Sequence, residues 1–184
     1  DFTQASRWNA AEVRTGEPAD GALCHFLRER GWIIDIDEHK TTPTLYAGLE
    51  SLPAWLHSAP EAWLVVPLLV GEDLLGYVVL SRPRTTVELD WEVRDLLKTA
   101  GRQAAGFLAQ MQATEALLMG LRLAEGVDLA ALSQRLDLAV DAMVNRRAID
   151  ELEGLGFVVM RDDRLQVTEA GMLLLDAILP KVVA

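Results

Sequence analysis

The residues able to do chemistry are few and scattered. The chain has one cysteine, Cys24, next to His25, and two further histidines, His39 and His57. Adjacent side chains diverge on a helix, and the histidines lack the spacing of metal ligands, so no metal site is expected. A single cysteine excludes an internal disulfide, an iron–sulfur centre and a zinc site built on several thiolates. The sequence therefore predicts no catalytic residue, no metal and no cofactor.

Motifs for phosphate binding and nucleophilic catalysis are also missing. Residues 154–156, Gly-Leu-Gly, precede a predicted strand and indicate the end of a helix, not half of a dinucleotide-binding motif. No Ser or Cys occupies a nucleophile motif. Carboxylates are plentiful, but in a chain with a net charge of −11 a solvated surface is the better interpretation for nearly all of them. We therefore predict that the protein is not an enzyme.

The elements that would position any site are organised around one long helix, predicted over residues 90–125. Asp90 is a suitable N-cap and Gly126 a suitable stop, and no proline interrupts the run. Apolar residues recur at alternating steps of four and three, which keeps them on one side of a helix. These positions are Val93, Leu97, Ala100, Ala104, Phe107, Met111, Leu118 and Leu121, with Thr114 as the polar member. The favoured interpretation is packing on the domain's own sheet, and the alternative is the seam of a homodimer.

Length and composition bound the class of protein. At 184 residues, 51% of them hydrophobic, the chain can form one large or two small domains with sizeable cores. No apolar run approaches ~18 residues, so no membrane span is predicted, and the lone cysteine favours a cytoplasmic location. The first residues look like a cut into a longer protein. The acidic balance argues against nucleic acid and anionic membranes as partners.

The first part of the chain, residues 1–116, predicts an antiparallel sheet with helices at both ends. Hydrophobic periodicity and turn residues define its elements. In chain order they are an amphipathic piece at 5–14, a helix at 21–30, a strand at 32–36, a long connection at 37–60, and strands at 62–68 and 75–81 joined by a hairpin turn at 71–73.

Two stretches of sequence in this part resemble a known family. AWLVVPLLVGEDLLGYVVLSRPR and LDWEVRDLLKTAGRQAAGFLAQMQATEALL resemble the GAF domain of sensor histidine kinases of the PEP-CTERM system, the PrsK type. In that family the helix continues to a phosphoacceptor histidine. Here every histidine precedes the helix, so no kinase chemistry carries over.

The resemblance to GAF domains also implies a place for a ligand. Such domains often hold a small molecule between the sheet and the long loop. The candidate ligand-binding residues are then the aromatic ones, Trp32, Tyr46, Trp55, Trp63 and Tyr77. The favoured interpretation is that these side chains fill a core without a ligand.

The last part, residues 117–184, predicts a small winged-helix-like domain. Helices are expected at about 128–134 and 139–153, and strands at 157–160 and 164–167 around a turn at Asp162 and Asp163. Thr168 is expected to cap a last helix. The residues of that helix predicted to point inward are Leu173, Leu174, Ile178 and Leu179.

This part resembles a second family. LLMGLRLAEGVDLAALSQRL and IDELEGLGFVVMRDDRLQVTEAGMLLLDAIL resemble the C-terminal domain of HemW-type radical-SAM haem chaperones, relatives of oxygen-independent coproporphyrinogen oxidase. The radical-SAM barrel and its cysteine triplet are absent, so the resemblance carries no reductive chemistry here.

Winged helices bind DNA through a helix and the wing, and that requires a basic face. The available cations are Arg135, Arg146, Arg147, Arg161 and Arg164. The acids Asp141, Asp150, Glu151, Asp162 and Asp163 lie among them. No nucleic-acid partner is therefore expected.

Together these observations predict an α+β protein in which domains 1–116 and 117–184 share the helix at about 90–125. The segment ATEALL suits both relatives and is a place where two terminal helices can be spliced. The favoured account is an engineered helix-sharing fusion, a non-catalytic structural or interaction protein, with a natural gene fusion or divergent regulator as the other origin. The alternative function is a sensory small-molecule-binding GAF module coupled to a winged-helix output.

Overall fold

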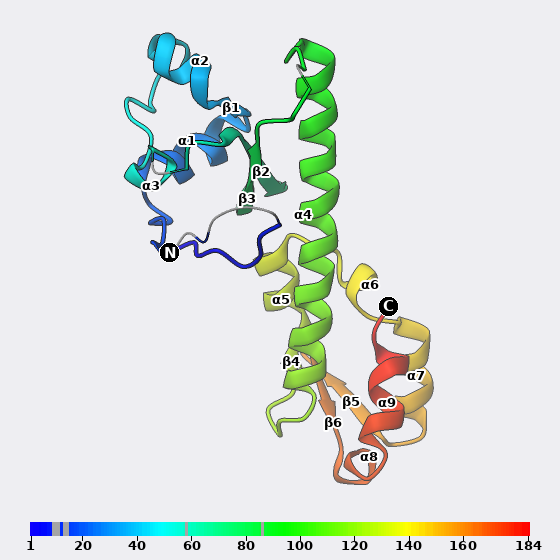
Figure 1. Ribbon diagram of the computed structural model, residues 1–184. Helices are drawn as coiled ribbons and strands as arrows, with labels where there is room; N and C mark the ends of the chain where they lie inside the picture. Colours follow the sequence, from blue (N-terminus) through cyan, green and yellow to red (C-terminus); the bar gives the residue numbers. More distant parts are fainter. Residues whose placement is uncertain (9–11, 13–14, 58, 86) are drawn as a thin grey trace. The chain divides into compact units, whose positions relative to one another are not determined.

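A computed structural model describes residues 1–8, 12, 15–57, 59–85 and 87–184. Half of the amphipathic piece predicted at 5–14 lies outside these residues. The chain forms two compact units, Asp1–Gly106 and Phe107–Ala184, here called the N-terminal and C-terminal units (Figure 1). Each unit combines helices with a three-stranded antiparallel sheet, so the predicted α+β class is confirmed.

The N-terminal sheet has the strand order β1-β2-β3. A nine-residue strand, β2 (Ala62–Val70), pairs antiparallel with β3 (Asp73–Ser81), so the strands predicted at 62–68 and 75–81 are confirmed. Gly71 takes a φ of 56° in the two-residue turn between them, a conformation that favours glycine. The third strand, β1 (Ile34–Asp35), is shorter than the predicted 32–36 because the next helix begins at Ile36.

Three short helices occupy part of the predicted long connection at 37–60. They are α2 (Ile36–Thr41), the 3-10 helix η1 (Pro43–Tyr46) and α3 (Ala54–His57). The carboxylate of Asp35 caps α2 by accepting from the N–H groups of Asp37 and Glu38, a local signal that periodicity over so few residues does not show. The first helix, α1 (Ala22–Arg30), ends as predicted at Gly31, whose φ is 58°.

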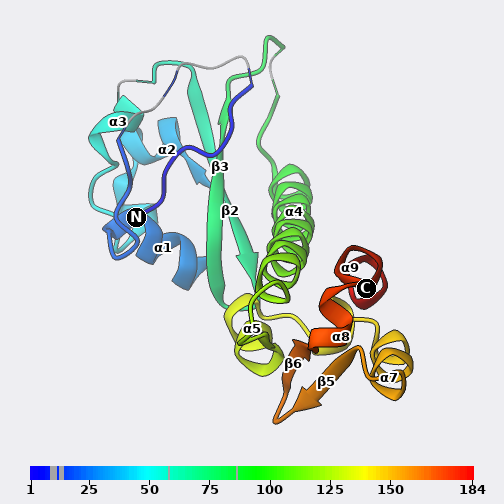
Figure 2. The same ribbon diagram turned by 90° about the horizontal axis from the view of Figure 1, so that it is seen from below.

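The two faces of the N-terminal sheet bury different groups. Helices α1 to α3 cover one face over a cluster that we call the N-terminal core (Figure 2). Its buried members are Leu23, Cys24, Phe26, Leu27, Ile34, Ile36, Tyr46, Leu49, Leu52, Leu56, Val65 and Leu74. A smaller cluster on the other face contains Leu64 and Val66 and packs against Leu97 of the long helix. Burial on both faces explains why β2 is a nearly continuous apolar run.

The long helix, α4, runs without interruption over Trp91–Gly120, and the boundary between the two units falls inside it. Asp90 caps it as predicted, its carboxylate accepting from the N–H of Val93 at 2.8 Å. The helix ends five residues before the predicted position 125. Tight turns follow the helix up to Gly126. At Gly126, whose φ is 67°, the chain reverses and enters the next strand.

The side of α4 that is buried differs from the predicted one. Ala105, Ala109, Ala113, Leu117 and Leu121 are completely buried, a series with steps of four. Such steps advance by about 40° more than a full turn, so the buried stripe winds around the helix. Four members of the predicted 4-3 series are exposed, so packing of these four on a sheet was a wrong prediction. They are Ala100, Ala104, Phe107 and Met111, and the last two are 67% and 54% exposed.

The C-terminal unit begins with the last turns of α4, and β4 (Val127–Asp128) and α5 (Leu129–Leu136) follow. The predicted strands are confirmed as β5 (Val158–Arg161) and β6 (Arg164–Val167), and the sheet has the order β4-β6-β5. Asp162 and Asp163 form the hairpin turn with φ values of 48° and 61°, as a type I′ turn requires.

Two predicted helices of the C-terminal unit are interrupted. The helix predicted at 139–153 is α6 (Val140–Met143) followed by α7 (Arg146–Gly154), because Val144 leaves the helix to bridge with Val183 and Asn145 caps α7. The apolar core of this unit includes Leu117, Leu121, Ile149 and Leu165.

The last helix is also divided. Thr168 caps α8 (Glu169–Met172) as predicted, and α9 (Leu175–Val182) follows after a turn. Leu173 and Leu174 lie in that turn and are 87% and 46% exposed, so their predicted inward orientation was wrong. Ile178 and Leu179 are buried as predicted. Over the described residues no helix is both long and apolar enough to cross a membrane.

Candidate functional site

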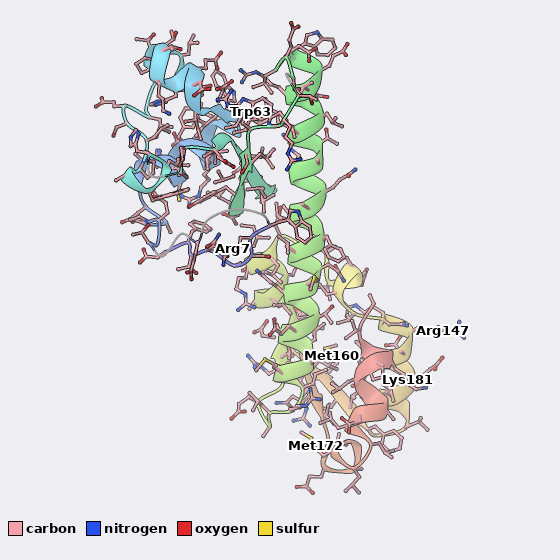
Figure 3. The ribbon with its side chains drawn as sticks, viewed as in Figure 1. Arg7, Trp63, Arg147, Met160, Met172 and Lys181 are labelled. Carbon is pink, nitrogen blue, oxygen red and sulfur yellow. The ribbon has the colours of Figure 1, made fainter. Side chains whose placement is uncertain are left out.

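The five candidate aromatic residues do not form one group. Trp55 of α3 and Tyr77 of β3 stack with ring centroids 6.2 Å apart, and both pack against the N-terminal core. Tyr46 of η1 belongs to the same core, but its ring lies beside that of Phe26, with the ring centroids 5.9 Å apart. Trp32 is 44% exposed, and Trp63 packs in the cluster on the opposite face, toward α4 (Figure 3). Ligand binding by these residues stays a prediction, centred on Trp55 and Tyr77.

A buried carboxylate that the sequence did not single out lies beside the stacked pair. Glu17 is only 6% exposed, and its Oε2 accepts a hydrogen bond of 2.9 Å from the indole N–H of Trp55. Its backbone pairs with Phe2, whose ring lies 6.0 Å from that of Tyr77. A single acid among many gives no periodic signal, and only the fold brings residue 17 to residue 55.

Two ionisable groups in this region have shifted pKa values. Burial, and then the charge of Glu17, raises the pKa of the Cys24 thiol to about 11. Burial also raises the pKa of the Tyr77 hydroxyl, with Glu17 adding to the effect. A buried thiol that stays protonated at neutral pH is a poor nucleophile and a poor metal ligand. That Cys24 supplies no chemistry stays a prediction.

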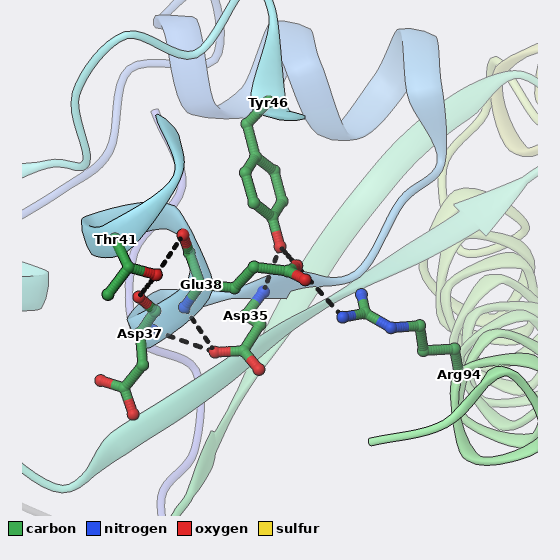
Figure 4. Close-up of polar contacts among 6 residues, drawn as sticks. All are labelled: Asp35, Asp37, Glu38, Thr41, Tyr46 and Arg94. Carbon is green, nitrogen blue, oxygen red and sulfur yellow. Dashed lines mark hydrogen bonds and ion pairs between the residues drawn. The ribbon is translucent and has the colours of Figure 1, made fainter. Parts of the chain in front are cut away.

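A second polar cluster involves Tyr46, and Figure 4 shows it in close-up. The Tyr46 hydroxyl donates to Oε2 of Glu38 and accepts from the N–H of Asp35 at 3.1 Å. Arg94 of α4 donates to the same Glu38 oxygen at 3.1 Å. The hydrogen bond from Tyr46 is the main cause of a lowered pKa of Glu38, and Arg94 lowers it further, whereas burial opposes both. Burial, and then the bond to Glu38, raises the pKa of Tyr46 to about 12.

The histidines are separated. His39 is buried and its Nε2 lies 2.8 Å from the carbonyl oxygen of Leu49, whereas His25 lies on the surface of α1 beside Glu29. Within the described part of the chain, no three His, Cys, Asp or Glu side chains are grouped so as to hold a metal ion.

Three of the five candidate cations of the C-terminal unit are paired with acids. Arg146 donates to Asp141 at 3.0 Å, Arg147 to Glu151 at 3.2 Å and Arg164 to Asp128 at 3.3 Å. Arg147 projects outward from α7 in Figure 3. Local neutralisation of this kind weakens the field that a nucleic acid would meet.

Comparison with known proteins identifies both parts. The model of the GAF domain matches residues 1–108, and that of the HemN C-terminal domain matches residues 109–174. The chain belongs to the GAF domain family, and a HemN C-terminal domain follows its GAF domain.

One curated relative matches the second part. The mitochondrial "Radical S-adenosyl methionine domain-containing protein 1" of Dictyostelium discoideum is 38% identical over 71 residues, which are 38% of this chain and 16% of that protein. The match thus spans about a sixth of the relative's length. No solved structure matches the chain.

Proposed function

We propose that the chain is an engineered helix-sharing fusion, a structural or interaction protein with no catalytic activity of its own. The observation that carries this proposal is the continuity of α4 over Trp91–Gly120. Leu97 packs with the N-terminal sheet, whereas Ala113 and Leu117 belong to the C-terminal core. The two family matches meet at residues 108 and 109, inside this helix, as expected where two terminal helices are spliced.

A proline at the boundary tests whether α4 connects the units rigidly. A Cβ on Gly106 would have no other atom within 4 Å, so Gly106→Ala should fit and Gly106→Pro should disturb only the helix itself. Proline removes a backbone hydrogen bond and kinks a helix at a cost of ~3 kcal/mol.

Tryptophan fluorescence reads out this experiment because all five tryptophans lie in the N-terminal unit. With a rigid helix, the decay of tryptophan anisotropy follows the tumbling of the whole chain. Gly106→Pro should shorten the rotational correlation time toward that of the N-terminal unit alone, and Gly106→Ala should not. Equal times for the two variants, with circular dichroism showing both folded, would contradict a rigid connection.

The interaction role includes a homodimer through α4. Leu96, Phe107 and Met111 are 67%, 67% and 54% exposed, and Ala100 and Ala104 between them are exposed as well. This apolar stripe carries no charge, which suits association of two copies of an acidic chain. Sedimentation should show a dimer that Phe107→Glu converts to a monomer, whereas Met119→Glu, at another exposed position of α4, should leave it dimeric.

The second candidate function is a sensory GAF module with the C-terminal domain as its output. The observation that favours it is the buried Glu17 carboxylate beside the half-buried rings of Trp55 and Tyr77. Polar groups converging on aromatic rings are typical of small-molecule sites. Native mass spectrometry separates the candidates, since a retained small molecule supports sensing and an unliganded mass supports the fusion.

A further inference from the structure

A polar link passes around one edge of the N-terminal sheet. Edge strand β1 separates α2 and η1, which cover the N-terminal core, from the start of α4 on the other face. The Glu38 Oε2 atom accepts from both the Tyr46 hydroxyl and the Arg94 guanidinium. One carboxylate oxygen of α2 therefore holds η1 and α4 together (Figure 4).

The same cluster satisfies the backbone of the edge strand. The N–H of Asp35 donates to the Tyr46 hydroxyl oxygen, and the Asp35 carboxylate accepts from the N–H of Glu38 at 3.1 Å. An edge strand can leave an N–H such as that of Asp35 without a ladder partner, and the first turn of a helix leaves an N–H such as that of Glu38 free, so the side chains that satisfy them are fixed in place. Both Tyr46 and Glu38 are thus tied to β1 as well as to each other.

The link differs in kind from the other contacts of α4 in this unit. Leu97 packs on the sheet through apolar contacts that tolerate small shifts. The contact of Arg94 with Glu38 is directional, and it depends on a carboxylate whose other partner belongs to η1. Tyr46 of η1 and Arg94 of α4 therefore share one hydrogen-bond acceptor.

We propose that Glu38 is a latch that couples the α2–η1 segment to the first turns of α4. In the closed state Glu38 binds both Tyr46 and Arg94. When α2 and η1 move, Glu38 stays with Tyr46 and releases Arg94. Tyr46 lies among the N-terminal core residues, 5.4 Å from the ring of His39, so a change in the packing of that core reaches α4. The latch is a property of the N-terminal unit and does not depend on the fusion proposed above.

Amide hydrogen exchange on the full chain tests the coupling in both directions, as thermodynamic coupling must be reciprocal. Arg94→Met removes the latch from α4. It should speed exchange at the amide of Leu49, which donates to the Tyr46 carbonyl at 2.8 Å. Glu38→Gln should speed exchange at the amides of Leu97 and Lys98 in α4. Because the ion pair is partly exposed, its loss should raise each exchange rate by about two- to fivefold.

A neighbouring ion pair supplies the matched controls. Asp37, also on α2, pairs with Arg82 just after β3, and both side chains are about half exposed. Arg82→Met should leave the exchange rate of Leu49 unchanged, and Asp37→Asn should leave Leu97 and Lys98 unchanged. Arg94→Lys keeps the charge and should stay within about twofold of the parent rates.

Two results would overturn the latch. The first is an unchanged Leu49 rate in Arg94→Met or an unchanged Leu97 rate in Glu38→Gln, because the coupling must act in both directions. The second is an equal acceleration by Arg82→Met or Asp37→Asn, because the effect would then be a general loosening of α2. Circular dichroism and tryptophan fluorescence confirm that each variant is folded.

Discussion

The two halves of α4 are held in different ways. In the N-terminal unit, Gly101 and Ala105 are its buried residues, and the contact is a close approach of small side chains reinforced by the polar link at Arg94. In the C-terminal unit, Ala109, Ala113 and Leu117 are fully buried. One half therefore lies on a sheet that has a separate core, whereas the other half is part of the core itself. A continuous helix can thus have different energetic roles in two domains.

The largest expected effect distinguishes two apolar side chains of the same helix. Leu117 is completely buried in the C-terminal core, whereas Met119 is 64% exposed and lies outside the proposed dimer stripe. Leu117→Ala should lower the free energy of unfolding of the C-terminal unit by ~2–5 kcal/mol, because it leaves a cavity. Met119→Ala should change stability by less than ~0.5 kcal/mol. Denaturant unfolding followed by circular dichroism measures both, and equal effects would contradict the difference between the halves.

A smaller effect tests the close approach in the N-terminal half. A Cβ on Gly101 would lie 2.7 Å from the backbone oxygen of Pro67 and 3.2 Å from Val66, so Gly101→Ala requires a shift of the sheet or the helix. We expect the free energy of unfolding of the N-terminal unit to fall by ~1–3 kcal/mol. Denaturant unfolding monitored by tryptophan fluorescence measures this loss.

Gly106→Ala is the control for this substitution, because it adds the same methyl group to the same helix in open space. It should stabilise by ~0.5–1 kcal/mol. A Gly101→Ala variant that is also stabilised would show that the close approach is absent.

The smallest effect concerns the pH dependence of the polar link. Because the folded state lowers the pKa of Glu38 below its ordinary 4.5, the contribution of this group is present above that value. It is lost as pH falls through the folded pKa. Glu38→Gln should therefore flatten the acid limb of stability of the N-terminal unit below about pH 4.5, whereas Asp37→Asn keeps the Glu38 contribution. Urea titrations at several acidic pH values measure it, and parallel acid limbs for parent and Glu38→Gln would contradict it.

Much of the fold follows from local patterns. The apolar runs at Ala62–Val70 and Asp73–Ser81, the cap at Asp90 and the turn at Asp162 and Asp163 are all visible in the sequence. The predicted 4-3 face of α4 failed at Phe107 because alanines at steps of four were the buried positions. A methyl group gives a weak hydrophobic signal, although it allows the closest packing.

The candidate site was less predictable because tertiary contacts create it. Trp55 and Tyr77 were identified as aromatic residues, but only the fold stacks them and places the carboxylate of Glu17 beside them. Glu38 and Arg94 are 56 residues apart and lie on opposite sides of a strand edge, so no spacing rule connects them. Helix α2 was also missed by the sequence analysis. Its start depends on one capping side chain, the carboxylate of Asp35, inside a segment predicted to be a connection.

The central claim is that two separate cores share one helix, and hydrogen exchange on a core variant tests it most directly. Leu165 is completely buried in the C-terminal core, so Leu165→Asp should bury an unpaired charge and unfold that unit. Leu173→Asp, at a position that is 87% exposed, is the control and should leave protection unchanged. In Leu165→Asp, protection should be lost over α5, α7, β5 and β6 but kept over β2 and β3. Loss of protection across the whole chain would mean one cooperative domain and would contradict the account.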